Sequence, residues 1–270
     1  IEQHSPLTIF RVPNMLLRMI EILPDNYDIG ATSLKVIASC GSAIPEGIVT
    51  KTLERFGPVL YNQYGSTEVS WATIANPDEL KANPTTAGRA PLGTRVQILD
   101  EDGNRVADGE TGRIFVGNNM LYEGYTRPGA DKQVIDGMVC TGDLGRMENG
   151  LLYISGREDD MIVSGGENVF PRQTEDALSQ LEGIRECAVA GVPDERFGQA
   201  LVAWVVRDDS PEGRALTNEQ IRTYVKQRLS RFAVPRETVF LDELPRNAVG
   251  KVVPRHLPKP WENVTEEKVA

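Results

Sequence analysis

Apolar runs of strand length alternate with a helical pattern in the first third of the chain, and this order restricts the fold most. Leu34 to Ser39 is a short apolar run of the kind buried in parallel sheets, and Val59 to Asn62 forms a second one. Between them, Pro45 stands where a proline opens a helix, and the helical pattern continues to Phe56. Strand, helix and strand in this order predict a parallel sheet covered by helices, and hence an α/β fold.

The pattern changes twice further along the chain. Short strand patterns with tight turns, from about residue 93 to residue 156, predict a β-rich subdomain. Beyond it, two strand patterns and two helical patterns predict a compact α+β unit, with Ser210 to Arg214 as a polar turn. Its last helix starts with a capping box formed by Thr217 and Gln220. We therefore predict a first domain over residues 1–158 and a second, small domain over residues 159–270.

Composition excludes several classes of function. The 270 residues carry a net charge of −10 without a basic run, so nucleic acid is not expected as the partner. No stretch approaches the roughly 20 apolar residues that cross a bilayer. The three cysteines are far apart, which predicts reduced thiols rather than a zinc site. These features together predict a cytoplasmic protein; its oligomeric state cannot be read from them.

The first motif whose residues could bind or act on a ligand is Tyr61 to Glu68 (YNQYGSTE), where a strand pattern leads into a glycine turn. Tyr64 offers a flat face for a base, and Gly65 would let the backbone approach a ligand closely. Thr67 could donate its hydroxyl to a phosphate, and Glu68 offers an oxygen ligand for Mg²⁺. The same residues would also suit a strand end with a polar turn that binds nothing.

Three further motifs follow. In Thr141-Gly142-Asp143, the carboxylate could accept two hydrogen bonds from the vicinal hydroxyls of a ribose. Gly156 to Asn168 (GREDDMIVSGGEN) places one arginine, two adjacent acids and a glycine pair around a short apolar strand. Leu244 to Arg255 (LPRNAVGKVVPR) puts Lys251 on a proline-flanked loop, where it could meet developing phosphate charge. Each pattern also occurs in ordinary turns, strands or exposed loops.

Taken in order, the four motifs resemble those of the adenylate-forming (AMP-binding) superfamily, whose members include acyl-CoA synthetases, peptide-synthetase adenylation domains and firefly-type luciferases. YGSTE resembles the family's Tyr-Gly-x-Thr-Glu motif, and TGD resembles its ribose-binding motif. GREDDMIVSGGENVFP resembles the hinge motif, and PRNAVGK resembles the catalytic-lysine motif. The resemblance extends from about Ile9 to Arg255, and it is strongest to the fatty-acyl and aryl-acid CoA ligases.

The resemblance implies a role for each motif residue. Tyr64 would stack on adenine, Thr67 would contact the α-phosphate and Glu68 would hold Mg²⁺. The other nucleotide-binding residues would be Gly41, Ser42, Ala43, Gly65, Asp143 on the ribose and Arg157 nearby. Asp159 would be the hinge of a mobile small domain, Lys251 would stabilise the charge that develops during adenylation, and Gly165 and Gly166 would border the path of CoA.

The implied reaction is the activation of a carboxylic acid, with a fatty acid favoured, by ATP and Mg²⁺, followed by transfer to CoA. The family's Gly-, Ser- and Thr-rich phosphate loop is not found in the 270 residues. We therefore expect residues 1–158 to be the C-terminal part of a large AMP-binding domain, and the chain to be a poorly active piece of a longer enzyme. Two alternatives stay open, namely loading of a carrier-protein thiol and a non-catalytic nucleotide-binding module.

Overall fold

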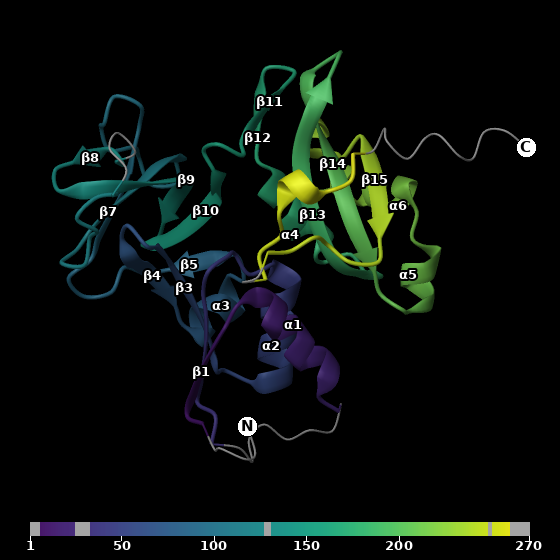
Figure 1. Ribbon diagram of the computed structural model, residues 1–270, viewed down its shortest axis with the longest axis horizontal. Coiled ribbons are helices and arrows are strands. Elements are labelled where there is room, and N and C mark those ends of the chain that lie inside the picture. The colour runs from purple at the N-terminus through teal and green to yellow at the C-terminus, as the bar shows by residue number, and fades with distance from the viewer. Residues whose placement is uncertain (1–5, 25–32, 127–130, 248–249, 260–270) are drawn as a thin grey trace, which may run out of the picture. The chain divides into compact units, whose positions relative to one another are not determined.

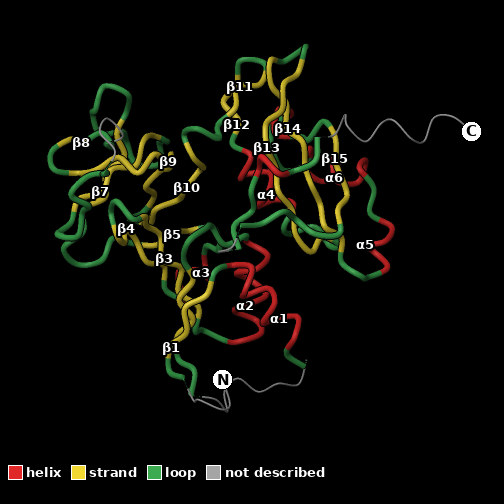
Figure 2. Tube along the Cα trace, in the orientation of Figure 1, coloured by secondary structure: helices red, strands yellow, loops and turns green. Residues whose placement is uncertain are grey.

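The computed structural model describes residues 6–24, 33–126, 131–247 and 250–259. The chain divides into two compact units, Ile1–Asp159 and Asp160–Ala270. Figure 1 shows the elements of each unit, and Figure 2 shows that strands predominate in both. Two residues of the predicted lysine loop, Ala248 and Val249, lie outside the described part of the chain.

The first unit begins with a four-stranded sheet in the order β1-β2-β3-β4. Strands β1 to β3 are parallel, and β4 runs antiparallel to β3. Helices lie beside this sheet (Figure 1). The elements are β1 (Thr8–Arg11), α1 (Pro13–Ile22), β2 (Val36–Ser39), α2 (Glu46–Phe56), β3 (Leu60–Ser66), β4 (Ser70–Ala75) and α3 (Pro77–Ala82).

Buried side chains of the helices hold them against this sheet. Leu16 of α1 and Val49 and Phe56 of α2 are buried in one cluster with Ile37 and Leu60 of the sheet. Burial of a side chain of this size contributes about 1.5–3 kcal/mol. The predicted strand, helix and strand are thus present, and the α/β fold class is confirmed.

A second, antiparallel sheet completes the first unit, with the order β5-β10-β9-β7-β6 and β8 paired to β9. Its strands are β5 (Thr86–Gly88), β6 (Arg95–Leu99), β7 (Gly112–Gly117), β8 (Val134–Ile135), β9 (Met138–Glu148) and β10 (Leu151–Arg157). A bridge between Ile74 and Arg89 joins the two sheets. Through this junction, the second sheet is fixed next to strands β3 and β4.

The second unit contains a five-stranded sheet in the order β12-β11-β14-β13, with β15 parallel to β14. Its strands are β11 (Ile162–Ser164), β12 (Glu167–Val169), β13 (Ile184–Asp194), β14 (Gly198–Arg207) and β15 (Glu237–Leu241). Its helices are α4 (Pro171–Leu178), α5 (Pro211–Ala215) and α6 (Asn218–Lys226), with short 3₁₀ turns at Arg231–Ala233 and Pro254–His256.

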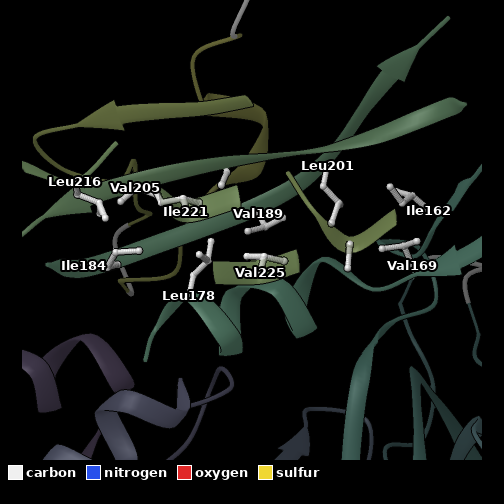
Figure 3. Close-up of a cluster of buried hydrophobic side chains, with 12 residues drawn as sticks. Ile162, Val169, Leu178, Ile184, Val189, Leu201, Val205, Leu216, Ile221 and Val225 are labelled. Carbon is white, nitrogen blue, oxygen red and sulfur yellow. The ribbon is translucent and has the colours of Figure 1, made fainter. Parts of the chain in front are cut away.

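Both faces of this sheet are covered. On one face, Leu178 of α4 and Ile221 and Val225 of α6 meet Val189 and Leu201 of the sheet (Figure 3). On the other face, Trp204 is buried, and its indole nitrogen donates to the Pro258 carbonyl 2.8 Å away. A strand covered on both sides carries apolar residues in succession, which explains the run from Ala200 to Val206.

The sequence predicted most of these elements but not all. The capping box of Thr217 and Gln220 is present at the start of α6. The prediction of a polar turn over Ser210 to Arg214 is wrong, because residues Pro211–Ala215 form helix α5. Ser210 caps this helix by accepting a hydrogen bond from the Gly213 amide. The three cysteines are free thiols, and no helix in the described ranges is long and apolar enough to span a bilayer.

The carboxyl group of Glu175 makes the stability of the second unit sensitive to pH. It lies between α4 and β13, where one oxygen accepts a hydrogen bond of 2.8 Å from the Val189 amide. Burial raises the pKa of Glu175 to about 7, the Val189 hydrogen bond and Arg172 lower it, and the charge of Asp176 raises it. The protonated form is therefore the one that the folded state favours.

We expect the free energy of unfolding to fall as pH rises from about 4.5 towards 7, because folding opposes the ionisation of Glu175. Glu175→Gln retains an acceptor for the Val189 amide without the charge. The variant should match the parent near pH 4 and exceed it by on the order of 3 kcal/mol at pH 8. Urea unfolding across this pH range tests the expectation, with Glu182→Gln at an exposed position as control. Equal pH dependence in parent and Glu175→Gln would contradict it.

Candidate active site

Strand β3 was predicted to end at Asn62, but it runs on to Ser66 and therefore includes most of the YNQYGSTE motif. The reason lies in β4, which pairs with it from Asn62 to Ser66. A Cβ atom on Gly65 would lie 1.8 Å from the Ser70 carbonyl oxygen. The close backbone approach predicted at Gly65 is therefore made by the neighbouring strand. Contact of Gly65 with a nucleotide stays a prediction.

The hydroxyl group of Tyr64 joins the two sheets of the first unit. It donates a hydrogen bond of 2.6 Å to Oδ2 of Asp143, which lies 79 residues further along the chain. Burial raises the pKa of Tyr64 well above its ordinary value, and the Asp143 carboxylate raises it further. Tyr64 therefore stays a neutral donor, and two residues from separate motifs meet directly.

Asp143 was predicted in a glycine turn, but it lies within the long strand β9. Gly142 supplies the local break, since its φ is +81°, a conformation that side chains oppose. Asp143 is the cross-strand partner of Arg157 on β10, and their side chains approach to 3.8 Å. Arg157 also lies 3.6 Å from the largely exposed carboxylate of Asp159. Antiparallel pairing of β9 with β10 therefore places Asp143 of the Thr141-Gly142-Asp143 motif next to Arg157, at the start of the Gly156 to Asn168 motif.

Glu68 follows β3 and is held by a loop that no motif indicated. Tyr125 donates its hydroxyl to Oε1 of Glu68, and the Tyr122 amide donates to the Glu68 carbonyl at 2.9 Å. Burial raises the pKa of Glu68, but hydrogen bonds and the Lys132 ammonium outweigh burial, so the pKa is lowered. The hydrogen bond to Glu68 raises the pKa of Tyr125 to about 12. Glu68 is therefore an ionised acceptor.

The surroundings of Glu68 fit the predicted metal. Mg²⁺ is commonly held by one or two carboxylates together with substrate phosphates, so a lone ionised carboxylate is an adequate protein ligand. Within the described ranges, no three His, Cys, Asp or Glu residues are grouped to form a metal site by themselves. The neighbouring Thr67 is exposed, so its hydroxyl is open to a ligand.

Residues Gly41–Ala43 follow β2 directly and are exposed, with Gly41 at a φ of +90°. Strand β2 is parallel to β3, and Ser39 pairs with Asn62. Both segments therefore leave the carboxyl ends of neighbouring parallel strands, which is where open α/β sheets bind ligands. The topology places this predicted adenine-pocket turn at the same sheet edge as the Tyr64 motif.

The second unit holds the two remaining predicted sites. Gly165, at a φ of +57°, connects β11 and β12, and a Cβ atom there would lie 2.6 Å from the ring of Phe232. Gly166, at a φ of +88°, has open space where its side chain would be. Both glycines are exposed, but packing explains the first, while the second has open space at its side-chain position. Contact of either glycine with CoA stays a prediction.

Lys251 is exposed, and the loop that carries it is braced at both ends. Its amide donates to the Asn247 side chain at 2.9 Å, and the Asn247 amide donates to the Lys251 carbonyl at 2.9 Å. Arg246 donates to the Gly250 carbonyl at 2.8 Å and to Glu186 of β13 at 2.5 Å. Arg246 and Glu186 were not predicted, because a brace between distant segments leaves no local pattern.

Comparison with known proteins is consistent with this arrangement. Residues 1–126 match the AMP-binding enzyme family, and residues 173–251 match the AMP-binding enzyme C-terminal domain. The chain is 36% identical to the medium/long-chain-fatty-acid–CoA ligase FadD8 of Mycobacterium tuberculosis over 93% of the chain and 45% of that protein. It is 37% identical to indoleacetate–CoA ligase of Aromatoleum aromaticum over 93% of the chain and 49% of that protein. The chain thus spans about half the length of these relatives.

Solved structures give the same result. The amide bond synthetase of Marinactinospora thermotolerans matches 93% of this chain and 52% of its own, with a TM-score of 0.84 and 29% identity. The o-succinylbenzoate CoA synthetase of Bacillus subtilis, in complex with its acyl-adenylate intermediate, matches 96% and 52%, with a TM-score of 0.80 and 28% identity. The chain therefore belongs to the adenylate-forming, AMP-binding superfamily.

Proposed function

We propose that this chain provides the adenine and ribose sites and the catalytic-lysine domain of an ATP-dependent acid–thiol ligase. The observation that carries the proposal is the meeting of Tyr64, Asp143 and Arg157 beside the Glu68 segment in one unit. The family and its CoA-ligase relatives support the reaction type and the use of ATP and CoA. A fatty acid is the first substrate class to test.

The reaction proceeds in two steps. A carboxylate oxygen of the acid attacks the α-phosphorus of ATP, the bond to the β-phosphate breaks, and pyrophosphate leaves. The CoA thiolate then attacks the acyl carbonyl of the resulting acyl-adenylate and expels AMP. Two anions meet in the first step, and Mg²⁺ held by Glu68 would supply positive charge to the phosphates.

In this scheme, Asp143 accepts hydrogen bonds from the ribose diol, and Arg157 orients the Asp143 carboxylate. Tyr64 lies against the adenine and holds Asp143 through its hydroxyl, while Thr67 donates to the α-phosphate. Lys251 offsets the negative charge that develops on the α-phosphate. Asp159 is the hinge for the second unit, and Gly166 borders the path of the thiol, with Gly165 fixing the turn.

Binding of AMP to the 270-residue chain tests the nucleotide site directly. We expect Asp143→Ala to weaken AMP binding by about 10- to 100-fold, because hydrogen bonds to a charged group contribute about 1.5–3 kcal/mol. The parent should prefer AMP to 2′,3′-dideoxy-AMP, and Asp143→Ala should lose this preference. Titration calorimetry gives both affinities, and the exposed turn variant Asp102→Ala serves as control. An unchanged preference in Asp143→Ala would refute the ribose assignment.

A further inference from the structure

Two cationic side chains converge over the Gly142 turn. A Cβ atom on Gly142 would lie 3.1 Å from Nζ of Lys132 and 3.6 Å from Nη2 of Arg157. The ammonium and guanidinium groups therefore share the space above one residue, next to the Asp143 carboxylate. The Asp143 and Asp159 carboxylates already lie 3.8 and 3.6 Å from Arg157, and Lys132 adds a second positive charge at the same place, which favours a further anion there.

The backbone of Lys132 is held in this position by the loop that also holds Glu68. The Lys132 amide donates to the Tyr122 hydroxyl at 2.9 Å, and the Tyr122 and Tyr125 rings pack edge to face at 5.1 Å. Oδ1 of Asp131 accepts a hydrogen bond of 3.1 Å from the Tyr125 amide. Lys132 is therefore linked, through its own amide and through the preceding Asp131, to the two tyrosines that contact Glu68.

Lys132 is connected to both ends of the predicted nucleotide site. At one end its Nζ lies over the turn that carries Asp143, and at the other its backbone is linked to Tyr122, whose amide donates to the Glu68 carbonyl. A nucleotide whose ribose is held by Asp143 and whose metal is held by Glu68 has its first phosphate between these two groups. The Nζ atom of Lys132 lies at the Gly142 side of this interval.

We propose that Lys132 is a further phosphate-binding residue, whose ammonium contacts the phosphate joined to the ribose of a bound nucleotide. The proposal rests on the proposed function, because it takes Asp143 as the ribose ligand. A lysine acts on phosphate as a compact point charge with three donors, which suits a group approached from one side. The competing role for Lys132 is charge balance of Asp143 and Glu68 alone.

Comparison of AMP with adenosine separates the two roles, because only AMP carries the phosphate. We expect Lys132→Met to weaken AMP binding to the 270-residue chain about tenfold or more, and to leave adenosine binding unchanged. Lys132→Arg should retain most of the AMP affinity, since the charge and donors remain. Titration calorimetry measures the affinities, and thermal unfolding checks that each variant is folded. Lys51→Met, at an exposed position on α2, is the matched control.

The outcomes also separate this proposal from the proposed function. If Lys132→Met weakens AMP and adenosine equally, or weakens neither, the phosphate role is refuted. If Asp143→Ala weakens both ligands while Lys132→Met alters neither, only the Lys132 proposal fails. If the parent chain binds neither AMP nor adenosine, the ribose assignment and the Lys132 proposal both fail.

Discussion

Lys251→Ala is expected to lower the rate of acyl-adenylate formation by about 10²- to 10³-fold, the loss that follows removal of one group that stabilises developing negative charge. The ammonium is needed when a carboxylate attacks the phosphate, because charge then accumulates on the phosphorus oxygens. Thiol attack on a preformed acyl-adenylate occurs at the acyl carbonyl. Thioester formation from a supplied acyl-adenylate should therefore fall less than tenfold. Pyrophosphate release and thioester formation are measured separately, in the polypeptide encoded by the complete reading frame.

Lys226→Ala is the matched control for this experiment, because Lys226 is an exposed lysine of helix α6 in the same unit. It should leave both half-reactions unchanged. Equal losses in the two half-reactions would mean that Lys251 supports the unit rather than the adenylation step. Unchanged pyrophosphate release in Lys251→Ala would show that the catalytic assignment is wrong.

Gly65→Ala is expected to destabilise the first unit by more than about 3 kcal/mol. The added methyl group would lie 1.8 Å from the Ser70 carbonyl oxygen and 2.9 Å from the Trp71 Cα atom. Both are backbone atoms, so relief requires β3 and β4 to separate, which exceeds the usual penalty of about 1–3 kcal/mol for overpacking. Urea unfolding of the 270-residue chain measures the change.

Gly109→Ala is the control, because Gly109 has a φ of +87° and nothing within 4 Å of its missing Cβ. It should lose only about 1 kcal/mol, the penalty for a side chain in a left-handed conformation. If Gly65→Ala were as stable as the parent and lost only nucleotide affinity, the glycine would serve a ligand and not the pairing of the strands.

The sequence was most informative where chemistry is local. The alternating runs around Pro45 predicted the parallel strands, and the Thr217 capping box predicted the start of α6, because each depends on neighbours within a few residues. Helix α5 was missed because proline and glycine at residues 211 and 213 are typical of turns. The Ser210 side chain nevertheless caps a helix there by accepting a hydrogen bond from the Gly213 amide.

In the candidate site, too, local motifs identified residues, while the contacts between them depend on the fold. Tyr64, Asp143 and Arg157 were recognised through motifs, but the 2.6 Å hydrogen bond between the first two arises from the junction of two sheets. Tyr125 and Lys132 were missed because neither lies in a motif that suggests a role. Tyr125 contacts Glu68 from 57 residues further along the chain, and Lys132 lies beside the Gly142 turn through the folding of its own segment onto β9. Residues whose contacts depend on the tertiary fold, and not on their spacing in the sequence, give no local pattern from which a role could be predicted.

The brace at Arg246 has a mechanical consequence. The arginine connects the Gly250 carbonyl to Glu186 of strand β13, so the backbone that carries Lys251 is anchored to the sheet of its own unit. The lysine side chain can extend from this anchor, but its backbone travels with the sheet. Loss of the Arg246–Glu186 contact would therefore release the backbone at Gly250 from β13 and with it the fixed starting point of the Lys251 side chain.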